Sequence, residues 1–214
     1  MKNIFLLLFY FFICFCFYLI FFYAPIEATQ GVVQKIFYFH VASAFAMYLG
    51  FGLSALFAIG YLLKRNISWD IHSHTGAGVG LVFASMVLLS GPLWAKPIWG
   101  TWWTWDPRLT TTLLIWLIFA SSLLVRDFFY DQGKGKVLAA LITLFGLIDM
   151  PLIFLSVKLW RGIHPSVLGQ KNSMPIEMRI TLIVSIFGIF FLFALLYYFT
   201  YRIYSLEQHL RGKR

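Results

Sequence analysis

Apolar residues are grouped along the chain into six long blocks that short polar segments separate. The blocks cover residues 4–23, 36–63, 75–94, 109–125, 137–157 and 176–201. Each is close to or longer than the roughly 20 apolar residues that a helix needs to cross a bilayer. The pattern therefore predicts an all-α integral membrane protein, a six-transmembrane-helix bundle that forms one membrane domain over residues 1–214.

The first block admits a second interpretation, because a basic residue, Lys2, precedes it as in a secretory signal. Its apolar run is longer than the core of a usual signal, and no Ala-x-Ala cleavage site follows. We therefore expect an uncleaved first helix.

Composition supports the membrane assignment. Of the 214 residues 61% are hydrophobic and only 12% are charged, whereas soluble domains are about half apolar and a quarter charged. A net charge of +9 would favour nucleic-acid binding in a soluble protein. Here the basic residues lie in short loops, where they orient helices, so we expect no nucleic acid among the partners and expect contact with membrane lipid instead.

The basic residues are unevenly divided between the two sets of loops. One set carries Lys2, Lys64, Arg65, Arg126, Lys134, Lys136, Arg202, Arg211, Lys213 and Arg214, and the other carries Lys35, Lys96, Arg108, Lys158, Arg161, Lys171 and Arg179. Because the more basic side of a membrane protein faces the cytoplasm, we expect both termini in the cytoplasm. The loops 24–35, 95–108 and 158–175 then face outward.

The predicted outward loop after the third block is dense in tryptophan. Five of the eight tryptophans of the chain lie within residues 94–105, namely Trp94, Trp99, Trp102, Trp103 and Trp105. An aromatic belt at the membrane surface is one interpretation, but it accounts for one or two tryptophans per helix end. We favour a platform for a large, flat, apolar ligand with an acidic edge, because indole faces supply stacking area. Arg108 or Lys96 would meet carboxylates of such a ligand, and Asp106 would hold Arg108.

Two histidines are predicted on the same side as these tryptophans. His40 lies near the outward end of the second helix, and His164 lies in the outward loop between the fifth and sixth helices. Imidazole is a standard axial ligand of haem iron, so the pair could clamp a haem between two remote parts of the chain. Lys35, close to His40 in sequence, is a candidate to pair with a haem propionate.

Other polar residues carry weaker predictions. His72 and His74 lie in the predicted inward loop and carry at most a weak metal-binding prediction. Asp149 lies inside the fifth helix, where a carboxylate is costly and is a functional candidate by default. Two interpretations stay open for Asp149, an orienting contact to the loop of His164 and a satisfied residue at the kink of Pro151. The two cysteines, Cys14 and Cys16, form no Cys-x-x-Cys-His site, so any haem would be held without thioether links.

The tryptophan-rich segment resembles a known signature. The run Trp99-Gly-Thr-Trp102-Trp103-x-Trp105-Asp106-x-Arg108-Leu-Thr110 is similar to that of the haem-handling proteins of cytochrome c maturation. The flanking Gly91-x-x-Trp94-x-Lys96-Pro97, Phe39-His40-Val41 and Asp149-x-Pro151 with Ser156-Val157 resemble one branch, the haem exporter protein C (cytochrome c maturation protein C) family. The resemblance covers residues 34–164. Leu159 and Pro107 depart from residues that are common in the family.

The resemblance implies a function and partners. It implies non-covalent haem b held at the outer, periplasmic membrane face by His40 and His164, with the tryptophan loop contacting haem or a haem-carrying partner. The implied partners are a periplasmic haem chaperone that receives the haem, a small single-span subunit and an ATP-binding-cassette subunit pair that hydrolyses ATP. The chain would then be a haem-delivery component and no enzyme, located in the bacterial inner membrane or the mitochondrial inner membrane.

Three other functions are compatible with parts of the pattern. A haem-attaching cytochrome c synthetase subunit shares the tryptophan signature, but proteins of that type are generally longer. A membrane cytochrome b that transfers electrons usually holds haem between histidines within helices, whereas here only His40 touches a helix. A small-solute transporter would show repeats or broken helices in pairs, and the sequence shows neither.

Overall fold

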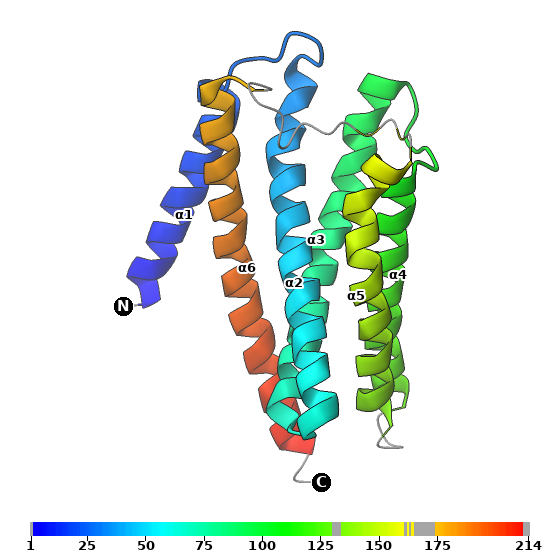
Figure 1. Cartoon of the computed structure of the whole chain (residues 1–214). Helices are drawn as coiled ribbons and strands as arrows, with labels where there is room; N and C mark the ends of the chain where they lie inside the picture. The colour runs from blue at the N-terminus through cyan, green and yellow to red at the C-terminus, as the bar shows by residue number, and fades with distance from the viewer. Residues whose placement is uncertain (1, 130–133, 161, 163, 165–173, 212–214) are drawn as a thin grey trace.

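Over its described residues the chain folds as a bundle of six α-helices that run up and down in turn (Figure 1). The computed structural model describes residues 2–129, 134–160, 162, 164 and 174–211. The helices are α1 (Lys2–Tyr18), α2 (Ile36–Lys64), α3 (Ile67–Trp99), α4 (Pro107–Phe128), α5 (Gly135–Leu159) and α6 (Ile176–Arg211). The predicted all-α membrane bundle is confirmed. Figure 1 shows that both termini point away from the loop between α3 and α4; the side of the membrane on which they lie stays a prediction.

Five of the helices are long and apolar enough to cross a membrane. The exception among the described helices is α1, which is shorter and continues as a single π-helical segment, η1 (Leu19–Tyr23). It packs on α6 and stands apart from the rest of the bundle (Figure 1). A short 3-10 helix, η2 (Val32–Lys35), leads into α2. The chain is therefore a multi-pass membrane protein.

The third helix is longer than the apolar pattern predicted. It begins at Ile67, where Asn66 caps its first turn by accepting a hydrogen bond from the Ser68 backbone N–H at 2.8 Å. The predicted inward loop is therefore mostly helix, and the placement of His72 and His74 in a loop is corrected, because both lie within α3. The apolar block begins only at residue 75 because polar residues precede it, but the bundle pairs several of those side chains internally, such as Asp70 with Arg126 and His72 with Tyr197.

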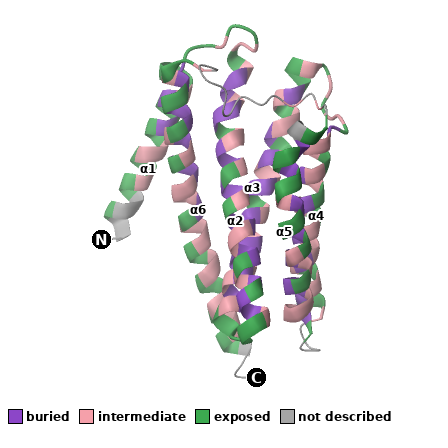
Figure 2. Cartoon of the chain, in the orientation of Figure 1, coloured by how far each residue is buried: buried purple, intermediate pink, exposed green. Residues whose placement is uncertain are grey.

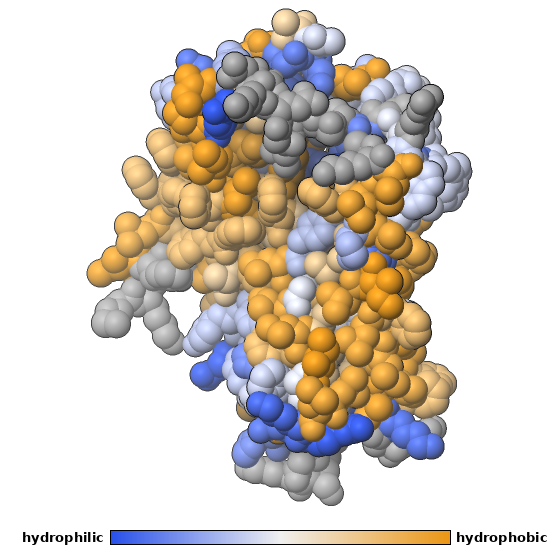
Figure 3. Space-filling model, viewed as in Figure 1, coloured by the Kyte–Doolittle hydropathy of each residue, from blue (hydrophilic) through white to orange (hydrophobic). Residues whose placement is uncertain are grey.

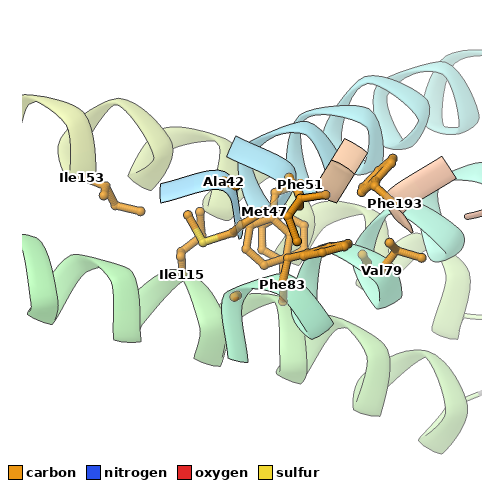
Figure 4. Packing of buried hydrophobic residues seen from close by; sticks show 13 residues of the cluster. Ala42, Met47, Phe51, Val79, Phe83, Ile115, Ile153 and Phe193 are labelled. Carbon is orange, nitrogen blue, oxygen red and sulfur yellow. The ribbon is translucent and has the colours of Figure 1, made fainter. Parts of the chain in front are cut away.

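Helix α2 lies at the centre of the bundle, and its close approach to α3 depends on glycine. An added Cβ on Gly50 would lie 2.6 Å from the Cα atom of Gly80. Small residues of this kind allow close helix contact in lipid, where apolar burial does not drive association. Figure 4 shows the adjoining core, in which Phe51, Met47 and Phe83 fill the space between the helices.

The surface of the bundle divides into three zones. Apolar side chains cover its middle, and polar residues gather at the two ends (Figure 3). Figure 2 shows that exposed residues predominate along α1, whereas buried residues are frequent along α2 and α3. Exposed apolar residues such as Phe11, Leu89 and Phe187 are expected where lipid is the solvent.

Candidate functional site

Most of the predicted site residues meet at one end of the bundle, where residues 100–106 join α3 to α4. We call this segment the tryptophan loop and this end of the bundle the tryptophan-loop end. Trp94 and Trp99 belong to the last turns of α3, and Gly100 ends that helix with a positive φ of 74°. Asp106 caps α4 and Arg108 lies in its first turn.

His40 is partly buried in the second turn of α2 and faces α3. Its Nδ1 atom lies 2.9 Å from the Oγ atom of Ser90. Its ring meets the edge of the Trp94 indole in a T-shaped contact with 5.8 Å between centroids. These contacts fix both the position and the rotation of the imidazole.

His164 is held against the start of α4 and the end of α3. Its Nδ1 atom lies 3.5 Å from Nη1 of Arg108, and its ring makes a T-shaped contact with Trp99 at 6.4 Å between centroids. His164 and Arg108 are both close enough to His40 to interact with it electrostatically. The structure thus brings together two histidines that are 124 positions apart in the sequence, with a guanidinium beside them.

Asp106 positions Arg108 through the backbone. Its carboxylate accepts a hydrogen bond of 2.9 Å from the Arg108 backbone N–H, which is the usual contact of an acidic helix cap. The carboxylate also packs against Gly162, where an added Cβ would lie 3.1 Å from the Asp106 Cγ atom. Asp106, which is buried, therefore joins the tryptophan loop to the segment that carries His164.

The tryptophans divide into an anchored and an open group. Trp94 donates from Nε1 to the side-chain oxygen of Gln30 at 2.9 Å. Trp102 and Trp105 are 55% and 76% exposed, whereas the Nε1 atom of Trp103 is buried and has no hydrogen-bond partner among the described residues. The open indoles offer apolar faces to a ligand or a partner protein, and Trp103 offers an unused donor.

The ammonium group of Lys35 donates to backbone carbonyl oxygens of η1 and of Ala24. Its Nζ atom is 2.7 Å from the carbonyl oxygen of Ile20, 2.9 Å from that of Phe21 and 3.4 Å from that of Ala24. An ammonium has three donors, so these carbonyls occupy all of them. Pairing with a propionate would require Lys35 to release the end of η1, and that predicted role stays untested.

Asp149 is buried in α5, and neither of its carboxylate oxygens has a hydrogen-bond partner among the described residues. Tyr48 on α2 interacts electrostatically with both Asp149 and Arg108. Asp149 therefore lies deeper in the bundle than the histidines and near the same polar group of residues. Neither of its two predicted roles has a contact that supports it.

The opposite end of the bundle holds a different polar cluster, whose charged and aromatic side chains contact one another in pairs. Arg126 donates two hydrogen bonds to the carboxylate of Asp70, and both residues are buried. His72 pairs with the hydroxyl of Tyr197 at 3.0 Å, and His74 stacks on Tyr204 with 3.7 Å between ring centroids. Unpartnered buried polar atoms of the described chain instead belong to Gln34, Tyr38, Ser43, Trp103, Thr104, Arg108 and Asp149.

Two site residues were missed by sequence reasoning. Ser90 lies one helical turn before Trp94, and this spacing places both on one helix face, but no pattern indicates that His40 faces them. Gly162 lies two residues before His164, and this position excludes a side chain because the Asp106 carboxylate occupies the space. Both residues matter only through neighbours that are remote in sequence.

The arrangement has the chemistry to hold a flat, apolar ligand that contains a metal and carries acid groups. Two imidazoles can bind the metal, indole faces can cover the ring, and Arg108 can pair with carboxylates. Within the described part of the chain, the Nε atom of Arg108 is buried and has no hydrogen-bond partner. Haem has these features, and the described residues fit it.

The chain is similar to proteins of known families. The family model described as Heme exporter protein C matches residues 1–214. A Heme exporter protein C of Bradyrhizobium diazoefficiens is 33% identical over 141 residues, which cover 66% of this chain and 54% of the relative, or about half of its length. A cytochrome c biosynthesis ccmC-like mitochondrial protein of Marchantia polymorpha is 33% identical over 78% of this chain and 70% of the relative. Heme exporter protein C of Escherichia coli K12 is 31% identical over 81% of this chain and 71% of the relative.

Proposed function

The chain belongs to the Heme exporter protein C family, and we propose that it binds haem b at the tryptophan-loop end and delivers it to a haem chaperone outside the membrane. Membership of this family supports a role in haem handling for cytochrome c biogenesis. It also supports a multi-pass location in the inner membrane of bacteria or mitochondria. In this proposal the chain is a transport component rather than a catalyst.

The observation that supports the proposal is that His40 and His164 lie at the same end of the bundle, each against a clustered tryptophan, and that His164 and Arg108 interact electrostatically with His40. In the proposal the two imidazoles bind the haem iron without any covalent link from the protein to the porphyrin. Arg108, whose contacts to His164 and to the Phe154 carbonyl oxygen are both 3.5 Å long, turns to pair with propionates. Trp99 and Trp103 cover the ring, since one touches His164 and the other has an unused N–H.

Release of haem is proposed to occur toward the exposed indoles. Trp102 and Trp105 are the most exposed of the five clustered tryptophans, and such rings are typical anchors of protein interfaces. We propose that the chaperone docks there. A single-span subunit and an ATP-binding-cassette pair complete the proposed complex. In the proposal the cassette pair hydrolyses ATP, and this chain does not.

The rival functions make different predictions for the same site. A synthetase would attach haem covalently to an apocytochrome, and an electron-transferring cytochrome b would be reduced reversibly by quinol. The exposed indoles of the tryptophan loop, at the same end of the bundle as the two histidines, favour delivery to a docked protein. Covalent attachment or quinol reduction by the purified chain would favour the corresponding rival.

The test is haem binding by the purified full-length protein. We expect the wild type to show the spectrum of six-coordinate, non-covalent haem and to load the chaperone with haem. The double variant His40→Ala with His164→Ala should lose both the spectrum and the loading. The matched control is His72→Ala with His74→Ala, which removes the two histidines at the opposite end and should retain the haem spectrum. Equal haem binding and chaperone loading by the wild type and the His40/His164 double variant would refute the ligand assignment.

A further inference from the structure

The hydrogen bond between His40 and Ser90 has a direction that the structure determines. A serine hydroxyl has one hydrogen to donate. The Ser90 Oγ atom lies 2.7 Å from the carbonyl oxygen of Met86, one turn earlier in α3, and a carbonyl can only accept. Ser90 therefore donates to Met86 and accepts from Nδ1 of His40 at 2.9 Å.

This direction selects the tautomer of His40. With the hydrogen on Nδ1, the Nε2 atom of the neutral ring carries a free lone pair. The rest of the ring is held from the same helix, by Trp94 at 5.8 Å and by Gly91, where an added Cβ would lie 3.4 Å from the His40 Cε1 atom. Helix α3 thus presents His40 with one nitrogen occupied and the other ready to bind a metal.

His164 has the opposite surroundings. The group beside its Nδ1 atom is the guanidinium of Arg108, with Nη1 at 3.5 Å, and a guanidinium can only donate. Its Nδ1 atom is therefore an acceptor, and the neutral ring carries its hydrogen on Nε2. Arg108 reaches its other acceptor, the carbonyl oxygen of Phe154, also at 3.5 Å, so both contacts are long and readily exchanged.

From this asymmetry we infer that the two histidines are unequal haem ligands, with His40 the firm ligand that Ser90 positions and His164 the ligand that Arg108 makes exchangeable. A hydrogen bond donated from the second ring nitrogen makes a histidine a stronger ligand, because it raises the basicity of the metal-binding nitrogen. The bond from Ser90 to Met86 extends this chain and polarises it further. A cation beside the second nitrogen has the reverse effect.

The inference rests on the proposed function. It makes Arg108 the residue that links propionate binding to iron binding by His164. The same guanidinium is the proposed partner of the propionates. When Arg108 turns to a propionate it leaves His164, whose ring can then present Nε2. Loss of the propionate contact returns Arg108 to His164, which favours release from that side while His40 still holds the iron.

The test compares two serines of α3 in the full-length protein reconstituted with haem. Ser90→Ala removes the acceptor for His40, and Ser90→Thr keeps a hydroxyl. Ser85→Ala is the matched control, because the Ser85 Oγ atom donates to Leu81 at 2.8 Å and accepts from a tryptophan, Trp116, at 2.8 Å. The readouts are haem affinity by titration, the reduction potential and the thermal midpoint of the haem-free protein.

We expect Ser90→Ala to lower haem affinity about 10- to 100-fold and to make the potential more positive, because a less basic ligand stabilises ferric iron less. Ser90→Thr should restore both values, and Ser85→Ala should match the wild type in both. A loss caused only by misfolding would lower the thermal midpoint and leave the potential of the remaining haem unchanged, which would overturn the inference.

The single histidine variants complete the test. We expect His40→Ala to lose haem more completely than His164→Ala, which should retain five-coordinate haem. Equal losses in the two variants, or wild-type affinity and potential in Ser90→Ala, would overturn the inference. If those results occur while the double histidine variant has lost its haem, the proposed function stands and this inference alone fails. Haem binding that persists in the double variant would refute both.

Discussion

Replacing Gly162 with alanine should displace His164 without touching it. An alanine Cβ at this position would lie 3.1 Å from Cγ and 3.3 Å from Oδ1 of Asp106, and closer still to Oδ2. Contacts under 3.0 Å are essentially never seen for a real Cβ, so either the carboxylate or the segment at Gly162 must move. The carboxylate is held by the backbone N–H of Arg108 at 2.9 Å, so we expect the segment with His164 to move.

The magnitude follows from the cost of overpacking. An added methyl group in a well-packed region costs about 1–3 kcal/mol. Each 1.4 kcal/mol corresponds to about a tenfold change in a dissociation constant. If most of this cost falls on the haem-binding arrangement, Gly162→Ala should weaken haem affinity roughly five- to 140-fold. Haem titration of the purified protein, with the absorption spectrum reporting the loss of the second axial ligand, measures the change.

A second variant separates this clash from other effects of the methyl group. Asp106→Ser retains a side-chain oxygen that caps α4 but shortens the group that the new Cβ would meet. In the Asp106→Ser background, Gly162→Ala should therefore change haem affinity much less than it does in the wild type. The reasoning is refuted if Gly162→Ala binds haem as tightly as the wild type, or if its effect is the same in both backgrounds.

Three further changes test the packing of the bundle. Arg126→Ala leaves the buried carboxylate of Asp70 with Lys136, at 4.0 Å, as its remaining cation and should cost up to about 3–5 kcal/mol of stability; adding Asp70→Ala should recover part of it, and additive losses in thermal unfolding would contradict the pairing. Gly80→Ala should lower the thermal midpoint, because its Cβ would lie 2.5 Å from a neighbouring side chain, whereas Gly52→Ala, with its nearest neighbour 3.9 Å away, should not. Asp149→Asn removes an unpartnered carboxylate that costs about 2.5–3.5 kcal/mol inside a span, so the thermal midpoint should rise; a fall would reveal a stabilising partner.

The helices could be predicted from the sequence because lipid leaves the backbone few choices. A segment in the bilayer must satisfy its own hydrogen bonds, so a long apolar block becomes a helix whatever its neighbours are. Where the chain leaves the apolar pattern, this argument ends. Residues 67–74 extend α3 because Asp70 meets Arg126 and His72 meets Tyr197, and the sequence does not indicate those partners.

The sequence by itself determined the number and type of the helices and the cluster of tryptophans. It also indicated His40 and His164 as the histidines on the same side as that cluster. Only the tertiary structure decided that Ser90 faces His40, that Arg108 faces His164 and that Gly162 lies on Asp106. The physical reason is that an apolar helix in lipid can rotate and shift without exposing apolar surface to water. Its register is therefore chosen by small-residue contacts and buried polar pairs between helices, which are properties of pairs of segments and not of either segment alone.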